Sequence, residues 1–142
     1  MSQANDWNTN VINDFRANNG QIGGPFAGAP LLLLHHRGRK SGQERVNPVM
    51  YLPSDDDPGV MYVFGSKRGE LVHPAWYHNL VAAGSTEVEV GAETFPVSVT
   101  EVTGAERDRI YAEQARRYPN FAEYEKTLEG RRTIPVLALR RV

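Results

Sequence analysis

A nine-residue stretch, RGRKSGQER (37–45), carries four cations and two glycines in a chain whose formal net charge is only −1. Arginine offers a planar fork of donors that matches phosphate or carboxylate, and lysine adds a compact positive charge. Glycine lets backbone N–H groups close on an anion. A second short basic segment, SKRG (66–69), follows later in the chain. These residue types favour the binding of an anionic small molecule over the binding of a polymer.

Two common phosphate-binding motifs do not fit the basic stretch. Lys40-Ser41 is preceded by Arg39 and followed by a strand pattern, whereas a P-loop needs glycine before the lysine and a helix after it. The glycines of GPFAGAP (24–30) have the wrong spacing for a dinucleotide fingerprint. A solvated basic turn that binds nothing stays the alternative at this point.

The composition excludes several classes of site. The chain has 142 residues, enough for one domain with a core, and no cysteine, which excludes disulfides, thiolate nucleophiles and zinc–cysteine sites. The four histidines show no ligand spacing, so we expect no metal site. The cations are confined to two loops, which argues against nucleic acid as a partner. The polar N-terminus does not resemble a signal peptide, so we expect a cytoplasmic protein.

The basic loops must be positioned by the elements around them, and the sequence patterns there are mostly those of short strands. Trp7, Val11, Ile12 and Phe15 recur at helical spacing, which predicts an amphipathic helix within residues 1–20. Alternation and turn signals predict strands over 31–36, 45–52, 60–65, 86–90, 94–102 and 133–142. Further helices are predicted over 74–83, 103–118 and 121–128.

Local sequence signals indicate where two of these helices begin or end. Pro74 suits a first helical turn, Gly84 suits the position after a last one, and Thr103-Gly104-Ala105-Glu106 is a capping-box sequence. Because no βαβ repeat occurs, we predict an α+β, mainly β fold. It is a small antiparallel barrel with flanking helices, a single domain over 1–142.

Neighbouring strand ends converge in a small barrel, so both basic segments are expected to meet. The helix that follows the second one begins with Trp76 and Tyr77, which would add a flat apolar wall. Anion-binding groups beside such a wall suit a phosphorylated aromatic cofactor.

Three stretches of the chain share a set of motifs with a known family: GRKSGQERVNPVMYL, VFGSKRGELVHPAWYHNLVAAG and RYPNFAEYEKTLEGRRTIPVLAL. Together they resemble the deazaflavin-dependent nitroreductase family. Its members are F420H2-dependent reductases on a split antiparallel β-barrel and are found in mycobacteria and related actinobacteria. The resemblance covers residues 25–142, and its motifs are specific in combination.

The resemblance implies that the cofactor is coenzyme F420, a flat tricyclic ring with a phosphate and an oligoglutamate tail. On this basis the cations of the basic stretch face the polyanionic tail. The implied cofactor-binding residues are Arg39, Lys40, Ser41, Arg45, Asn47, Pro48, Val49, Phe64, Gly65, Ser66, Lys67, Trp76, Tyr77 and Asn79. The implied catalytic residues are Ser66, Tyr118 and Tyr124. Phe121 and Met50 stand where some relatives carry tyrosine, which removes a hydroxyl at each position.

The implied reaction is hydride transfer from C5 of the reduced deazaflavin to a planar electrophile such as a quinone or a nitroaromatic compound. An FMN-binding split-barrel oxidoreductase and a non-catalytic F420 carrier are the alternatives. The N-terminal helix could bring the protein to a membrane surface, although Asp6 and Asp14 make it acidic. The resemblance is compatible with a monomer or a homodimer.

Overall fold

The computed structural model describes residues 3–18 and 30–142. The elements in chain order are α1 (Gln3–Ala17), β1 (Leu31–Arg37), β2 (Glu44–Pro53), β3 (Val60–Phe64), the 3-10 turn η2 (Lys67–Gly69), α2 (Ala75–Ala83), β4 (Ser85–Val90), β5 (Glu93–Val102), α3 (Gly104–Arg117), α4 (Pro119–Leu128) and β6 (Val136–Arg141).

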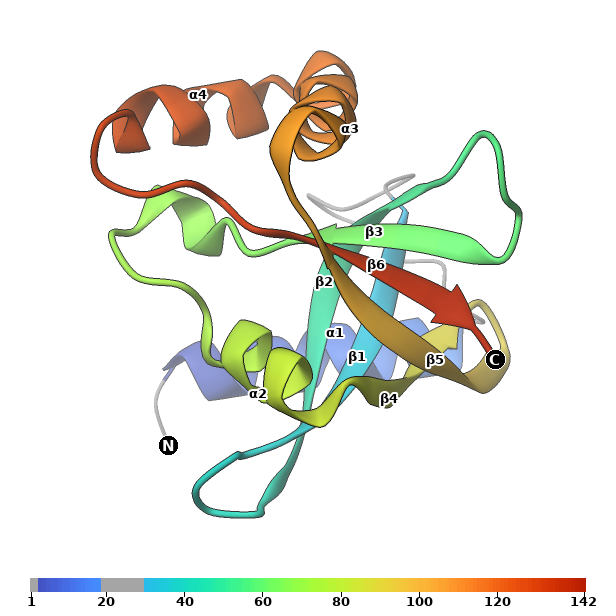
Figure 1. The fold of residues 1–142 in the computed structure, drawn as a ribbon. Helices are drawn as coiled ribbons and strands as arrows, with labels where there is room; N and C mark the ends of the chain where they lie inside the picture. The colour runs from blue at the N-terminus through green and yellow to red at the C-terminus, as the bar shows by residue number, and fades with distance from the viewer. Residues whose placement is uncertain (1–2, 19–29) are drawn as a thin grey trace.

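The six strands close into one antiparallel barrel in the order β1-β2-β3-β6-β5-β4 (Figure 1). Every neighbouring pair is antiparallel, and the longest ladder joins β1 to β2 from Leu31↔Met50 to Arg37↔Glu44. The predicted α+β barrel is therefore confirmed. Closure leaves no long strand edge unpaired, which suits a small all-antiparallel sheet.

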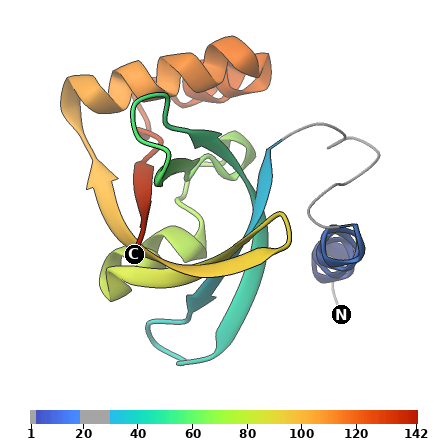
Figure 2. The same cartoon turned by 90° about the vertical axis from the view of Figure 1, so that its right-hand side faces the viewer.

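The apolar run in β1 reflects burial on both faces of the strand. Leu32 and Leu34 point into the barrel, whereas Leu31 and Leu33 pack outside it under α1. Figure 2 shows α1 end-on, outside the barrel and away from the other helices. A strand covered on both sides needs apolar residues at consecutive positions, because alternation serves only a half-exposed strand.

The apolar side chains of α1 pack against β1 and β2. Val11, Ile12 and Phe15 contact the outer face of the β1–β2 pair, and Phe15 is fully buried. Arg16 then fastens the last turn of the helix to β4 through two hydrogen bonds to Glu89, of 3.0 and 2.7 Å. No helix among the described residues has the length and apolarity needed to cross a bilayer.

Helix α2 packs against β1, β4 and β5 and places buried side chains in the barrel core. Trp76 and Leu80 are buried among inward-facing residues of all the neighbouring strands. Gly84 ends the helix in a left-handed conformation with φ of 74°, and its N–H donates to the Leu80 carbonyl. Pro74 precedes the first helical residue and is not in the first turn as predicted, because its ψ of 151° is extended.

Helices α3 and α4 pack against each other and cover the β3–β6 side of the barrel (Figure 1). Pro119 ends α3 and opens α4, as its missing N–H allows. The predicted capping box is wrong, since the Thr103 side chain makes no cap hydrogen bond. Gly104 takes φ of 65°, outside the helical region, so the first turn of α3 is irregular.

Candidate active site

The basic stretch forms the tip of the β1–β2 hairpin, at the lower end of the molecule in Figure 1. Gly38 N–H donates to the Gln43 carbonyl at 2.9 Å, and Gly42 N–H donates to the Gly38 carbonyl at 2.8 Å. Gly42 has φ of 71°, a left-handed conformation that favours glycine. The Ser41 hydroxyl accepts a hydrogen bond from the Gln43 N–H at 3.2 Å. The tip is therefore an ordered turn that displays its cations.

Three of these cations have no acidic partner in the part of the chain that the structure describes. Arg37 pairs with Glu44 across the hairpin at 2.9 Å, but within residues 3–18 and 30–142 no acidic side chain pairs with Arg39, Lys40 or Arg45. All three are exposed. Like charges held together without counter-charges raise the free energy of the unliganded protein, and an anion lowers it.

A chain of hydrogen bonds ties this hairpin to α2. The Arg39 N–H donates to Asn79 Oδ1 at 3.1 Å, Asn79 Nδ2 lies 2.9 Å from His36 Nδ1, and His36 Nε2 lies 2.6 Å from Asn47 Oδ1. His36 and Asn79 are both buried. The predicted site residues Arg39, Asn47 and Asn79 are thus brought together by one buried network.

The second basic segment is held by an arginine that the sequence analysis gave no role. Arg132 donates from Nη1 to the Gly65 carbonyl at 2.9 Å, from Nη2 to the Ser66 carbonyl at 2.8 Å and from Nε to the Glu70 carbonyl at 3.0 Å. Its Nη1 also lies 2.7 Å from His73 Nδ1. One guanidinium therefore fixes both ends of the loop that contains η2. The doubled arginine before β6 is the only sequence signal for it, and that signal does not indicate a partner.

Lys67 sits in this loop in a strained conformation. Its φ of 46° makes it the single non-glycine residue with positive φ in the described part of the chain. Such a conformation persists only where the surroundings enforce it, and strained residues cluster at functional sites. The Lys67 side chain is exposed and, like the hairpin cations, has no acidic partner among the described residues.

Arg132 also affects the protonation state of His73. Burial lowers the pKa of His73, and the adjacent Arg132 charge lowers it further. The imidazole is then neutral and accepts the Arg132 hydrogen bond on Nδ1. This keeps the guanidinium aimed at the three carbonyls.

Helix α4 brings its tyrosines toward the η2 loop. A Cβ added at Gly69 would lie 3.3 Å from the ring of Tyr124, so the loop and this ring are in close contact. The Tyr124 hydroxyl accepts a hydrogen bond from Asn120 Nδ2 at 3.2 Å. Tyr118 and Tyr124 flank Phe121 at ring-centroid distances of 6.5 and 5.5 Å. The predicted catalytic residues Ser66 and Tyr124 are thus on adjacent elements, with Tyr118 at the start of α4.

The structure places three other predicted residues in supporting positions. Phe64 packs edge-on against Tyr111 and Phe121, and Gly65 is buried with its N–H donating to the Pro135 carbonyl. Trp76 is only 7% exposed, so it supports the barrel interior and is not an exposed wall.

Tyr77 points away from the hairpin network. Its hydroxyl donates to Glu101 at 2.8 Å, and burial and this carboxylate raise its pKa to about 12. The structure therefore does not join Tyr77 to the other predicted site residues.

Pro48 and Val49 connect the two parts of the candidate site. Both lie on β2, between Asn47 near the basic tip and Met50, which packs against the core under α3 and α4. Figure 1 shows β2 running from the tip toward these helices, with the η2 loop between α2 and α4.

Gln114, on α3, is fully buried, and neither polar atom of its side chain has a hydrogen-bond partner in the part of the chain that the structure describes. An unpaired buried amide costs about 1–3 kcal/mol. We expect Gln114→Met to raise the free energy of unfolding by about 1 kcal/mol. Urea denaturation measures this change, and a loss of stability of similar size would show that the amide is paired.

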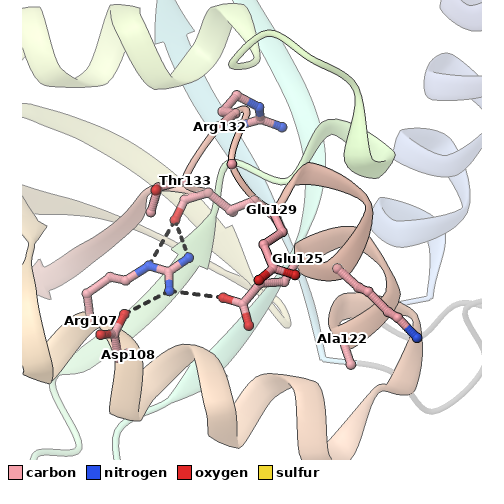
Figure 3. A pocket seen from close by; sticks show the side chains of 10 residues that line it. Arg107, Asp108, Ala122, Glu125, Glu129, Arg132 and Thr133 are labelled. Carbon is pink, nitrogen blue, oxygen red and sulfur yellow. Dashed lines mark hydrogen bonds and ion pairs between the residues drawn. The ribbon is translucent and has the colours of Figure 1, made fainter.

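The two pockets on the α3–α4 side do not contain the predicted site. One has a volume of about 530 Å³ and is lined by Arg107, Glu125 and Thr133 among others, and Figure 3 shows it from close by. Arg107 donates twice to the Ile134 carbonyl and pairs with Asp108 and Glu125. Its hydrogen bonds hold the chain before β6 against α3, which is a structural role. The second pocket, of about 230 Å³, contains His73 and Glu101.

No group of three or more His, Asp or Glu side chains suited to a metal ion occurs among the described residues. The candidate site consists of cations, amides, hydroxyls and strand backbone. Such groups can hold an anionic organic cofactor without a metal.

The chain is similar to several known proteins over nearly its whole length. Residues 7–141 match the F420H2-dependent quinone reductase family. An F420H2-dependent quinone reductase of Mycobacterium tuberculosis is 34% identical over 134 residues, which cover 89% of this chain and 85% of that protein. The solved structure of an F420H2-dependent reductase has a TM-score of 0.67 and 31% identity, covering 78% of this chain and 94% of that one. A second solved structure, described only as a domain-swapped dimer, has a TM-score of 0.69 and 28% identity, covering 97% of this chain and all of that one. The chain belongs to the F420H2-dependent quinone reductase family.

Proposed function

We propose that this protein reduces a quinone with F420H2, using the basic hairpin for the cofactor tail and the space between β2, the η2 loop and α4 for the ring and the acceptor. The family supports the reaction. The main observation that supports this placement is the ordered hairpin tip, whose three exposed cations have no acidic partner among the described residues.

The residues present fit coenzyme F420. Its phosphate and glutamate carboxylates need several cations within a short reach, and Arg39, Lys40 and Arg45 supply them. Arginine and lysine bind phosphate and carboxylate oxygens through charge-assisted hydrogen bonds. The Ser41 hydroxyl accepts a hydrogen bond from the Gln43 N–H and keeps its own proton to donate.

The ring is expected beside Asn47, Pro48 and Val49. Pro48 has no N–H, so an apolar edge interrupts the polar backbone here, which suits a flat ring. On the other side, Arg132 presents the loop of Gly65, Ser66 and Lys67 in one conformation. We assign to Ser66 a polar contact with the ring and to Lys67 a positive charge near its edge.

The bound cofactor supplies the chemistry, a hydride delivered from C5 of the reduced deazaflavin. The protein must then orient the acceptor, exclude water and stabilise the oxyanion that develops when a quinone accepts a hydride. Tyr124 accepts its hydrogen bond from Asn120, so its own hydroxyl proton can be donated to that oxygen. Tyr118 is the second such donor, and a proton at this oxygen completes the hydroquinone.

The same site would accept a nitroaromatic compound, which is also planar and electrophilic. Met50 and Phe121 at the helical end of the site offer apolar surface without a hydroxyl, so we expect nitro compounds to be reduced less well than quinones. A matched pair of a quinone and a nitroaromatic compound of similar size tests this preference.

Two further properties stay proposals. We extend dimerisation to this chain because a relative over its full length is described as a domain-swapped dimer. Contact with a membrane surface through α1 would require the helix to leave the barrel, because Val11, Ile12 and Phe15 are packed against it.

Calorimetric titration with F420, and in parallel with FMN, tests the cofactor assignment. We expect saturable F420 binding that weakens as salt is raised, since exposed cations hold the tail, and no comparable binding of FMN. Binding of FMN in place of F420 would move the protein to another class of split-barrel oxidoreductase. Tight F420 binding without turnover of any acceptor would indicate a carrier.

A further inference from the structure

The network between the basic hairpin and α2 has only one consistent arrangement of donors and acceptors. The Arg39 backbone N–H can only donate, so Asn79 must present Oδ1 to it, at 3.1 Å. This orientation turns Asn79 Nδ2, also a donor, toward His36 Nδ1 at 2.9 Å. Nδ1 of His36 must therefore be the acceptor, which defines the neutral imidazole with its proton on Nε2.

The other side of the imidazole agrees with this assignment. His36 Nε2 then donates to Asn47 Oδ1 at 2.6 Å. The Arg39 N–H, both polar atoms of the Asn79 side chain and both ring nitrogens of His36 are each paired, and both His36 and Asn79 are buried. A satisfied buried network of this kind fixes the relative positions of its members.

Protonation of His36 breaks this series of hydrogen bonds in either orientation of the Asn79 amide. The imidazolium would place an Nδ1–H against the Asn79 Nδ2–H, two donors face to face. Rotating the Asn79 amide by a half-turn repairs that contact, but it sets Nδ2 against the Arg39 N–H. In either arrangement Asn79 of α2 faces a second donor, the His36 Nδ1–H in the first and the Arg39 backbone N–H in the second.

We infer that His36 is a positioning residue that, as the neutral imidazole protonated on Nε2, holds the basic hairpin in its cofactor-binding conformation, so that protonation of His36 weakens F420 binding. This inference rests on the proposed function, because it assumes that the cations after Arg37 bind the F420 tail. His36 itself does not need to touch the cofactor.

The charged groups around His36 also favour its neutral form. The titratable or charged groups that face it are Arg45 from β2 and His35 from its own strand, while α2 presents the uncharged Asn79. Burial lowers the pKa of His36, and the charges of Arg45 and His35 lower it further, against the hydrogen bond to Asn47. The neutral form is thus favoured at neutral pH, and protonation begins only below the ordinary range of a histidine.

The test measures the dissociation constant of oxidised F420 by calorimetry, together with the pKa of each histidine by NMR. We expect the wild-type affinity to fall about tenfold between about pH 7.5 and about pH 5, since one buried hydrogen bond is lost. By thermodynamic reciprocity, saturation with F420 should lower the pKa of His36. His36→Gln, which does not titrate, should give a flatter pH profile.

His35→Gln is the matched control, because His35 is adjacent in the sequence but turned outward to Glu89 at 2.7 Å. It should keep the loss of F420 affinity at low pH that the wild type shows, because His36 still titrates in this variant. Equal pH profiles for wild type and His36→Gln, or a His36 pKa that F420 leaves unchanged, would overturn the inference while F420 binding itself persists. Absence of F420 binding at every pH would instead overturn the proposed function, and the inference with it.

Asn79→Asp provides a test of the network that needs no cofactor. A carboxylate can accept from both the Arg39 N–H and an Nδ1–H of His36, so we expect the His36 pKa to rise by about one unit or more in the free protein. An unchanged His36 pKa in this variant would show that the two side chains are not coupled. This measurement also decides the matter if His36→Gln fails to fold.

Discussion

Replacing Lys40 and Arg45 together with alanine should weaken F420 binding about 100-fold, because each charge-assisted contact to the cofactor tail contributes about 1.4 kcal/mol at an exposed site. Neither side chain has an acidic partner among the described residues, so its removal leaves no buried charge behind and should hardly change stability. Calorimetry measures the affinity, and thermal unfolding measures the stability. The wild-type salt dependence of binding should also become shallower in the double variant.

Arg109→Ala is the matched control for this experiment. Arg109 is exposed on α3, so its replacement by alanine removes one positive charge far from the hairpin. It should leave the F420 affinity within about twofold of wild type, since distant exposed charges are screened. Equal losses of F420 affinity from Arg109→Ala and from the single variant Lys40→Ala would contradict the assignment of the cofactor tail to the hairpin. They would instead indicate a general effect of net charge.

Removal of the Arg132 guanidinium should damage both stability and cofactor binding. Arg132→Ala deletes four hydrogen bonds, to the carbonyls of Gly65, Ser66 and Glu70 and to His73. We expect the free energy of unfolding to fall by about 2–3 kcal/mol, since three carbonyls lose a charged donor. The strained backbone of Lys67 would then relax, so F420 affinity should also fall about tenfold.

Arg131→Ala controls for the loss of charge beside this site. Arg131 is the adjacent residue and its side chain is exposed, so its removal should change the unfolding free energy by less than about 0.5 kcal/mol. Arg132→Lys should recover only a small part of the affinity, because an ammonium group cannot span the carbonyls that a guanidinium fork reaches. Full recovery with lysine would mean that charge alone, and not the geometry of the loop, supports the cofactor.

Strand and turn chemistry made most of this fold predictable. The hairpin around the basic tip, the Gly84 helix end and the Pro119 break each depend on local backbone rules, and each is confirmed. The capping box failed because the left-handed Gly104 distorts the turn that the motif requires. Local sequence does not reveal that distortion, since glycine also accepts helical angles.

The site was predictable only where adjacent residues carry it. The cations of the hairpin tip are contiguous in sequence, so their grouping was evident from the start. Asn79, His36 and Arg39 meet across separate elements, and no spacing rule connects them. Arg132 likewise acts on a loop more than sixty positions earlier in the chain. Trp76 was expected as an exposed wall, but a tryptophan at the start of a helix can equally turn into a barrel interior.

The most direct test of the account is the oxidation of F420H2 by menadione, followed under anaerobic conditions with wild type and with the Lys40→Ala/Arg45→Ala variant. We expect a rate proportional to wild-type enzyme, and a loss of about 100-fold in kcat/KM for F420H2 in the variant. A wild-type rate no greater than the reaction without enzyme would contradict quinone reduction, and an unimpaired variant would contradict the assignment of the basic hairpin to the cofactor tail.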